Sequence, residues 1–263
     1  MTLIKKLLCA AMALMMILSL GLAQAEHLDS VKSSGKLIFA TSPDYAPFEF
    51  LDGEGNVVGA DVALAQHIAK ELGVELQIEA LDFDTVVASV ATGKVDIAIS
   101  AISPTEERKQ SMLFSMGYHS EGDQVLLVLS KNADQYKALS DFDGKVVAAQ
   151  NGSLQQTLVN DQLPAAKMEP ILKIPDAIMM VMTEKVDALA VAYNVAEQYI
   201  KNYPELVVAE PKFDYQNDGE AVAIPLDSPA LLEAVNAIVQ EVVDSGLYLT
   251  WLDEAIQLSN SLN

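Results

Sequence analysis

Two segments of this chain read alike and have the same surroundings, and this repetition constrains the fold more than any other feature. Residues 92–101 read "TGKVDIAISA" and residues 183–192 read "TEKVDALAVA". An apolar stretch of helical length precedes each segment, and a Lys-led apolar run lies further upstream in each half, at residues 36–40 and 145–149. Chance explains one such pair easily, but three pairs in the same order predict two α/β lobes of like design.

The strand-like runs are short, apolar and rich in β-branched residues, and helical patterns follow them. This alternation is typical of mainly parallel sheets that helices cover on both faces. We therefore predict a two-lobed α/β clamp, with residues 26–121 and 223–263 in lobe 1 and residues 122–222 in lobe 2. The chain is expected to cross between the lobes near residues 121–123 and 221–223. In such sheets ligands bind beyond the carboxyl ends of strands, so a ligand cleft is expected between the lobes.

The first 25 residues have the pattern of a secretory signal peptide. Lys5 and Lys6 precede a long apolar run that ends in Ala23-Gln24-Ala25, a typical cleavage site. A retained membrane anchor is the alternative interpretation. Cleavage after Ala25 would remove Cys9, the one cysteine of the chain, and would leave an exported protein that needs no disulfide, as suits a bacterial periplasm.

Composition argues against several classes of partner and activity. The net charge of −21 repels the phosphates of nucleic acids and anionic membrane surfaces, so we expect neither as a partner. The sequence has no G-x-S-x-G motif or phosphate-binding loop, and His27, His67 and His119 lack metal-ligand spacing. We therefore predict no catalytic residue, no metal site and no cofactor, and we expect a monomer that binds a small molecule.

Arg108 is the only arginine among 263 residues, in a chain that otherwise uses lysine. It follows a strand-like run and the stretch Ser103-Pro104-Thr105-Glu106, which has the form of a helix start with a Ser cap, Pro at the first position and Glu at the third. A side chain five residues into that helix leans back toward its N-terminus, where free N–H groups attract anions. The planar guanidinium grips two carboxylate oxygens at once, which Lys cannot do. We therefore predict a carboxylate site; the alternative is a surface ion pair with Glu106 or Glu107.

A second helix start follows the strand-like run at residues 145–150. Ser153 and Gln156 have the spacing of a capping box, and Gly152 allows a ligand to approach the backbone closely. This helix start is expected to face Arg108 across the cleft. Capping boxes are also common as purely structural features, and that interpretation stays open.

The chain resembles the extracellular solute-binding proteins of ABC importers for polar amino acids. The resemblance covers nearly the whole mature chain, in order, through "GKLIFATSPDYAPFEF", "GADVALAQHIAKELGV", "DFDTVVASVATGKVDIAIS", "TEERK" with "FSMGY", "GKVVAAQNGSLQQ" and "KVDALAV". The spacing between these blocks is kept as well as their content. The resemblance implies a hinged periplasmic clamp that closes on one amino acid and delivers it to an ABC permease in the inner membrane.

The same resemblance implies ligand contacts in the first lobe. Tyr45 and Phe83 would sandwich the side chain of the ligand, and Ser100 and Ala101 would offer backbone groups. Aromatic packing in the core is the alternative role of Tyr45 and Phe83.

The carboxylate site implied by the resemblance draws on both lobes. Ser103 and Arg108 would bind the α-carboxylate from the first lobe, and Gly152, Ser153 and Leu154 would complete the site from the second.

Two positions depart from the family pattern. Ala192 stands where the family usually has an Asp or Glu that pairs with the α-ammonium, and Tyr193 or Asn194 could supply neutral acceptors instead. Ser42 stands where relatives that bind basic amino acids often carry Asp, although Asp44 remains near the expected cleft. A polar amino acid is the predicted ligand, and the alternatives are a carboxylate that is not an amino acid or a dehydratase-like enzyme on the same scaffold.

Overall fold

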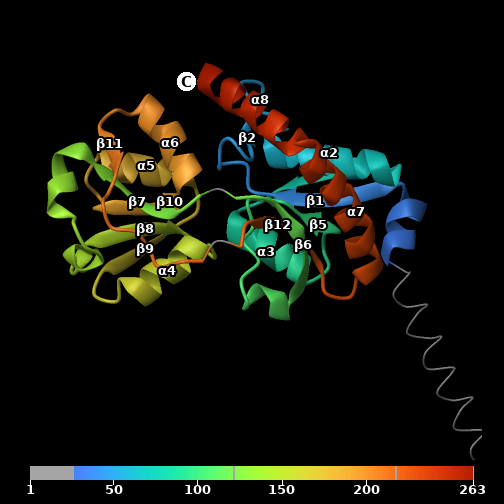
Figure 1. Cartoon of the computed structure of the whole chain (residues 1–263), viewed down its shortest axis with the longest axis horizontal. Coiled ribbons are helices and arrows are strands. Elements are labelled where there is room, and N and C mark those ends of the chain that lie inside the picture. The colour runs from blue at the N-terminus through green and yellow to red at the C-terminus, as the bar shows by residue number, and fades with distance from the viewer. Residues whose placement is uncertain (1–26, 121, 217, 263) are drawn as a thin grey trace, which may run out of the picture.

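The computed structural model describes residues 27–120, 122–216 and 218–262, which form two α/β lobes side by side (Figure 1). The predicted signal peptide, its cleavage site after Ala25, Cys9 and the expected crossover residue Glu121 lie outside the described residues. Among the described helices, none combines the length and the hydropathy that crossing a bilayer requires.

The first lobe contains a five-stranded sheet in the order β4-β1-β5-β12-β6. Its strands are β1 (Lys36–Thr41), β4 (Glu75–Ala80), β5 (Ile97–Ala98), β6 (Met112–His119) and β12 (Glu220–Pro225). Strand β1 pairs in parallel with β4 and β5, whereas β12 is antiparallel to both β5 and β6. Four strands therefore run in one direction, and β12, which enters from the other lobe, runs against them.

The second lobe repeats this arrangement in the order β9-β8-β10-β7-β11. Its strands are β7 (Gln124–Leu129), β8 (Val146–Gln150), β9 (Lys167–Ile171), β10 (Ala188–Ala192) and β11 (Leu206–Val208). Strand β8 is parallel to β9 and β10, whereas β7 is antiparallel to β10 and β11. Here β7 is the reversed strand, and it too arrives from the other lobe. The predicted repeat and the mainly parallel sheets are thus confirmed.

Helices cover both faces of each sheet because successive strand residues point to opposite faces. In the first lobe, α3 (Phe83–Ala91) packs on the face formed by Ala40, Ala98 and Ala223, and α2 (Ala60–Leu72) and α7 (Pro229–Ser245) cover the other face. In the second lobe, α4 (Leu154–Gln162) lies on one face, and α5 (Ile174–Met182) and α6 (Tyr193–Asn202) lie on the other (Figure 1). The C-terminal helix α8 (Leu247–Ser261) packs against α2. A short hairpin of β2 (Phe50–Leu51) and β3 (Val57–Val58) precedes α2.

The chain crosses between the lobes twice. The first crossing lies between β6, which ends at His119, and β7, which begins at Gln124. The second was expected at residues 221–223, and this expectation is wrong, because Ala221 pairs with Gly117 and Ala223 with Phe114 inside the first sheet. The second crossing therefore precedes Glu220, the first residue of β12.

A helix at residues 27–34 is fixed to the first lobe through His27. The Nε2 atom of His27 lies 2.7 Å from Oδ1 of Asp96, and its Nδ1 atom contacts the hydroxyl of Ser228. The hydrogen bond to Asp96 raises the pKa of His27 above 6.5, against the opposing effect of burial.

Candidate functional site

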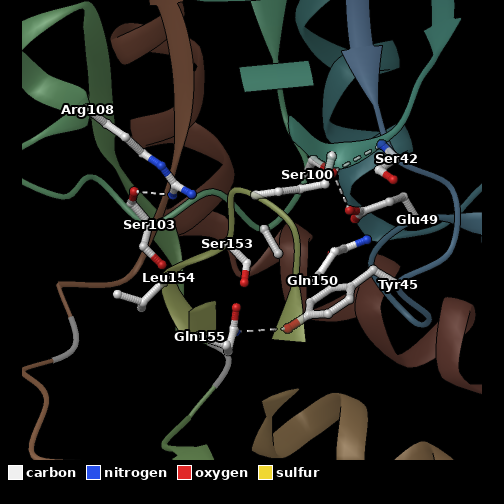
Figure 2. A pocket seen from close by; sticks show the side chains of 12 residues that line it. Ser42, Tyr45, Glu49, Ser100, Ser103, Arg108, Gln150, Ser153, Leu154 and Gln155 are labelled. Atoms are coloured by element: carbon white, nitrogen blue, oxygen red, sulfur yellow. Dashed lines mark hydrogen bonds between the residues drawn. The ribbon is translucent and has the colours of Figure 1, made fainter. Parts of the chain in front are cut away.

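A small cavity lies between the lobes (Figure 2). Its walls come from the loops that follow β1 and β5, from the start of α3, and from the junction of β8 and α4. The lining residues are Ser42, Tyr45, Glu49, Phe83, Ser100, Ala101, Ser103, Arg108, Gln150, Ser153, Leu154 and Gln155.

No α-helix begins at Ser103, so this part of the sequence prediction is wrong. Residues 101–105 are irregular, and Arg108 begins the short 3-10 helix η1 (Arg108–Gln110). An α-helix capped by Ser103 would need the carbonyl of Ser103 to accept from the N–H of residue 107. That carbonyl instead accepts from the N–H of Thr105 at 2.9 Å and from Nη1 of Arg108 at 2.9 Å. The arginine side chain thus occupies the acceptor that would have started the helix.

Arg108 nevertheless points back into the cavity, as predicted, and is 9% exposed. Its Nη2 atom donates to the carbonyl of Gly152 in the second lobe at 2.9 Å, and its guanidinium lies over the ring of Phe83, 5.5 Å from the centroid. The alternative of a surface pair with Glu106 or Glu107 is not supported, because the Arg108 side chain is buried in the cavity wall and Glu106 pairs with Lys109 at 2.7 Å. The guanidinium is held by backbone carbonyls of both lobes, which fixes its orientation.

The second helix start has the predicted Ser153 cap, but the Gln156 side chain bonds one residue before the cap and does not complete a capping box. Ser153 caps α4, and its hydroxyl accepts from the N–H of Gln156 at 3.1 Å, while the side-chain oxygen of Gln156 accepts from the N–H of Gly152 at 2.8 Å. Gly152 has a φ of 73°, and an added Cβ would lie 3.1 Å from the Cβ of Asp84 in the first lobe. Gly152 itself is not among the lining residues and contributes its carbonyl to Arg108.

Glu49, which was not among the predicted contacts, lines the cavity and is 1% exposed. Its Oε1 atom accepts from the hydroxyl of Ser100 at 2.6 Å. No local pattern marked Glu49, because successive side chains of an extended segment point to opposite faces, and an acid between two aromatic residues is then expected to face solvent.

Asp61 supports this region from behind the cavity. Its carboxylate accepts from the N–H of Ala101 at 2.8 Å, from the hydroxyl of Tyr118 at 2.9 Å and from that of Tyr248 at 2.6 Å. Complete burial raises the pKa of Asp61, and these hydrogen bonds act in the opposite direction. Ala101 has a φ of 47°, so the bond to Asp61 holds a left-handed backbone that an alanine seldom adopts.

Asp44 and Tyr193, the two further candidate residues from the sequence, do not line the cavity. Asp44 joins the lobes, because its carboxylate accepts from Nε2 of Gln150 at 3.1 Å and from the N–H of Ile174 at 2.9 Å. Burial raises the pKa of Asp44. Tyr193 is the first residue of α6, is 41% exposed and bonds to Glu197 at 3.4 Å.

The structure thus gathers eight of the nine predicted contact residues around one cavity and places Gly152 beside them. Besides Glu49, the predicted contacts omitted Ser42, Gln150 and Gln155. Ser42 was noted only as a departure from the family pattern, and the two glutamines have no motif of their own. The ligand-binding role of each residue stays a prediction.

Comparison with known proteins agrees with this architecture. Residues 37–254 match the family described as bacterial extracellular solute-binding proteins, family 3. The arginine-binding extracellular protein ArtP of Bacillus subtilis is 31% identical over 92% of this chain and 94% of its own length. The ABC transporter arginine-binding protein 1 of Escherichia coli is 28% identical over 81% and 87%.

A solved structure shows the same fold. The amino acid ABC transporter substrate-binding protein AbpA of Streptococcus pneumoniae, bound to L-arginine, superposes with a TM-score of 0.84 at 38% identity, covering 88% of this chain and 98% of that protein. None of these three relatives is named as an enzyme. The chain belongs to the bacterial extracellular solute-binding proteins, family 3.

Proposed function

We propose that this protein binds L-arginine between its lobes and delivers it to an ABC permease. The observation that carries the proposal is the placement of Arg108 and Glu49 at opposite sides of one cavity, with Ser100 between them (Figure 2). A cationic and an anionic group so separated complement a ligand with a carboxylate at one end and a cation at the other. Relatives named as arginine-binding proteins, and one solved with L-arginine bound, support the same ligand.

In this arrangement the α-carboxylate of arginine lies against Arg108 and the N-terminus of α4. Two N–H groups of a guanidinium meet two carboxylate oxygens in one plane, and the free N–H groups of a helix start add to the attraction. The guanidinium of the ligand lies against Glu49. The rings of Tyr45 and Phe83, which are 8% exposed each, pack against the methylene chain between the two charged ends.

The transport role rests on the family and on the two-lobed fold. The protein acts as a monomer in the periplasm, and its lobes close on the ligand by a hinge motion. The permease in the inner membrane then receives the closed form. The direct contacts between lobes, such as Asn151 to Asp84 at 2.6 Å and Gln150 to Asp44 at 3.1 Å, support a closed form that is stable enough to be recognised.

Calorimetry with L-arginine and L-citrulline tests the ligand. Citrulline has nearly the same shape but carries a neutral urea group in place of the guanidinium, so it loses the ion pair with Glu49. We expect citrulline to bind the mature chain, residues 26–263, about 100-fold more weakly, because an uncompensated buried charge costs about 2–5 kcal/mol. Equal binding of the two ligands, or no binding of arginine, would refute the proposal.

The variant Glu49→Gln assigns the difference to one residue. We expect it to reduce the preference for arginine over citrulline to about tenfold or less, because the neutral amide favours neither ligand by charge. Glu54→Gln is the matched control, because Glu54 is exposed in the turn between β2 and β3 and should leave the preference unchanged.

A further inference from the structure

We propose that the α-amino group of the ligand meets a neutral site, formed by Gln155 with Gln124 and Ala192 behind it, so that an α-ammonium is not required for binding. The ligand class then includes ω-guanidino carboxylic acids that lack the α-amino group. This inference rests on the proposed function, because Arg108 and Glu49 must take the two charged ends of the ligand.

The charges of the cavity provide the first argument. Among the twelve lining residues, all within the described part of the chain, Glu49 is the one carboxylate and Arg108 the one cation. L-Arginine has two cationic groups and one anionic group, so one of its cations has no charged partner in the lining. Nearby carboxylates are engaged elsewhere: Asp44 binds Ile174, Asp61 binds Tyr248 and Asp84 binds Asn151.

The orientation of Gln155 provides the second argument. Its Nε2 atom donates to Oε1 of Gln124 at 2.6 Å and to the hydroxyl of Tyr45 at 3.4 Å. Because the amide nitrogen is bound on that side, the amide oxygen points away from it, toward Ser153 and the interior of the pocket (Figure 2). The second lobe therefore presents a neutral acceptor to the ligand. Gln155 is 7% exposed and Gln124 is 2% exposed, so the pair is fixed by its surroundings.

Sheet register explains why no acid reaches this place. Ala192 on β10 is the direct antiparallel partner of Gln124 on β7, and directly opposed residues project their side chains to the same face of a sheet. The methyl group of Ala192 therefore lies on the face where Gln124 meets Gln155. The N–H of Ala192 is 3.4 Å from the hydroxyl of Tyr45, which lines the cavity. A carboxylate at position 192 would stand beside the Gln155 amide, but this chain has a methyl group there.

A neutral acceptor contributes less to the binding of an ammonium than a buried carboxylate does. Removal of the α-amino group from arginine therefore deletes one hydrogen bond to a neutral amide, and it also removes the free-energy cost of dehydrating the ammonium. We expect the two effects to keep the affinities of arginine and its deaminated analogue within about tenfold of each other.

Calorimetry on the mature chain with L-arginine, 5-guanidinopentanoic acid and agmatine tests the inference. The first two share both charged ends, and agmatine lacks the carboxylate. We expect 5-guanidinopentanoic acid to bind within about tenfold of arginine, and agmatine to bind more than about 100-fold more weakly than arginine. A loss of more than tenfold for 5-guanidinopentanoic acid would overturn the inference and leave the proposed function intact.

The outcomes separate the two proposals. Binding of 5-guanidinopentanoic acid alone would refute L-arginine as the ligand and support the neutral site, whereas binding of neither compound would refute both.

The variant Ala192→Asp should raise the preference for arginine over 5-guanidinopentanoic acid at least tenfold, and Ala192→Asn, which adds a side chain of the same shape without charge, should not. An unchanged preference in a folded Ala192→Asp protein would place the α-amino group elsewhere. If Ala192→Asp does not fold, the three ligands still decide the matter with the unmodified protein.

Discussion

Arg108 makes contacts that only a guanidinium can make from this position. It donates to the carbonyls of Ser103 and Gly152, each at 2.9 Å, from two different nitrogens, and its plane lies over Phe83. An ammonium has a single nitrogen, and it can neither bridge these two carbonyls in the same geometry nor stack on the ring as a plane. This explains why a chain with lysine at its other basic positions keeps one arginine here.

Replacing Arg108 with lysine should weaken the binding of L-arginine by about 2–5 kcal/mol and leave the fold intact, because the ligand carboxylate loses its two-point partner. Calorimetry measures the affinity, and circular dichroism checks the fold. The neighbouring change Lys109→Arg is the control, since Lys109 forms an exposed pair with Glu106. An affinity of Arg108→Lys within about twofold of the unmodified protein would contradict a carboxylate site at this residue.

At the scale of elements, the start of α4 and the start of α3 approach each other across the cavity. The contact depends on Gly152, whose missing side chain lets the turn before α4 lie against Asp84. Gly144, in the turn before β8, has nearly the same backbone, with a φ of 74° against 73°, but nothing lies within 4 Å of its Cβ position. Alanine variants at the two glycines therefore distinguish the effect of backbone strain from the effect of contact between the lobes.

Gly152→Ala should strain the left-handed backbone and also hold the lobes apart, whereas Gly144→Ala should only strain the backbone. We expect Gly152→Ala to lower the affinity for L-arginine by about 1–3 kcal/mol, the usual cost of overpacking, and Gly144→Ala to leave it unchanged. Melting temperatures should fall in both variants, since alanine in this backbone region is strained. The explanation fails if both variants lose affinity equally.

The helix at residues 27–34 should make stability depend on pH through His27. The pKa of His27 is raised in the folded protein by Asp96, so protonated histidine favours the folded state. Its contribution is fully present below the unfolded pKa of about 6.5 and is lost as the pH rises through the folded pKa. Denaturant unfolding between pH 5 and 9 should therefore show that the difference in stability between the unmodified protein and His27→Asn shrinks at high pH. A difference that is constant with pH would exclude this role.

At the scale of the whole molecule, two lobes joined by two crossings predict closure on binding. Contacts such as Asn151 to Asp84 and Arg108 to Gly152 join the lobes in the structure, and we expect the empty protein in solution to break them by hinge rotation. Small-angle scattering should then give a smaller radius of gyration with saturating L-arginine than without it. The same radius in both states would show that the empty protein is already closed.

The sequence alone determined much of the architecture, because local patterns specify secondary structure and repeats specify its arrangement. The helix beginning at Phe83, the repeated segments at residues 92–101 and 183–192, and the cap at Ser153 are all written in consecutive residues, and the structure contains them. Arg108 was also identifiable, since its residue type is unusual in this chain and it follows a strand in a parallel sheet, where ligands bind.

Tertiary structure decided what depends on partners distant in sequence. The carbonyl of Ser103 accepts from the Arg108 side chain instead of starting a helix, and the second crossing precedes Glu220 because β12 pairs with β6. The inclusion of Glu49 in the cavity and the orientation of Gln155 by Gln124 likewise follow from packing between segments that no local pattern relates. Hydrogen bonds and burial of this kind are set by three-dimensional proximity, and therefore the neutral surroundings of Ala192 became visible only in the folded chain.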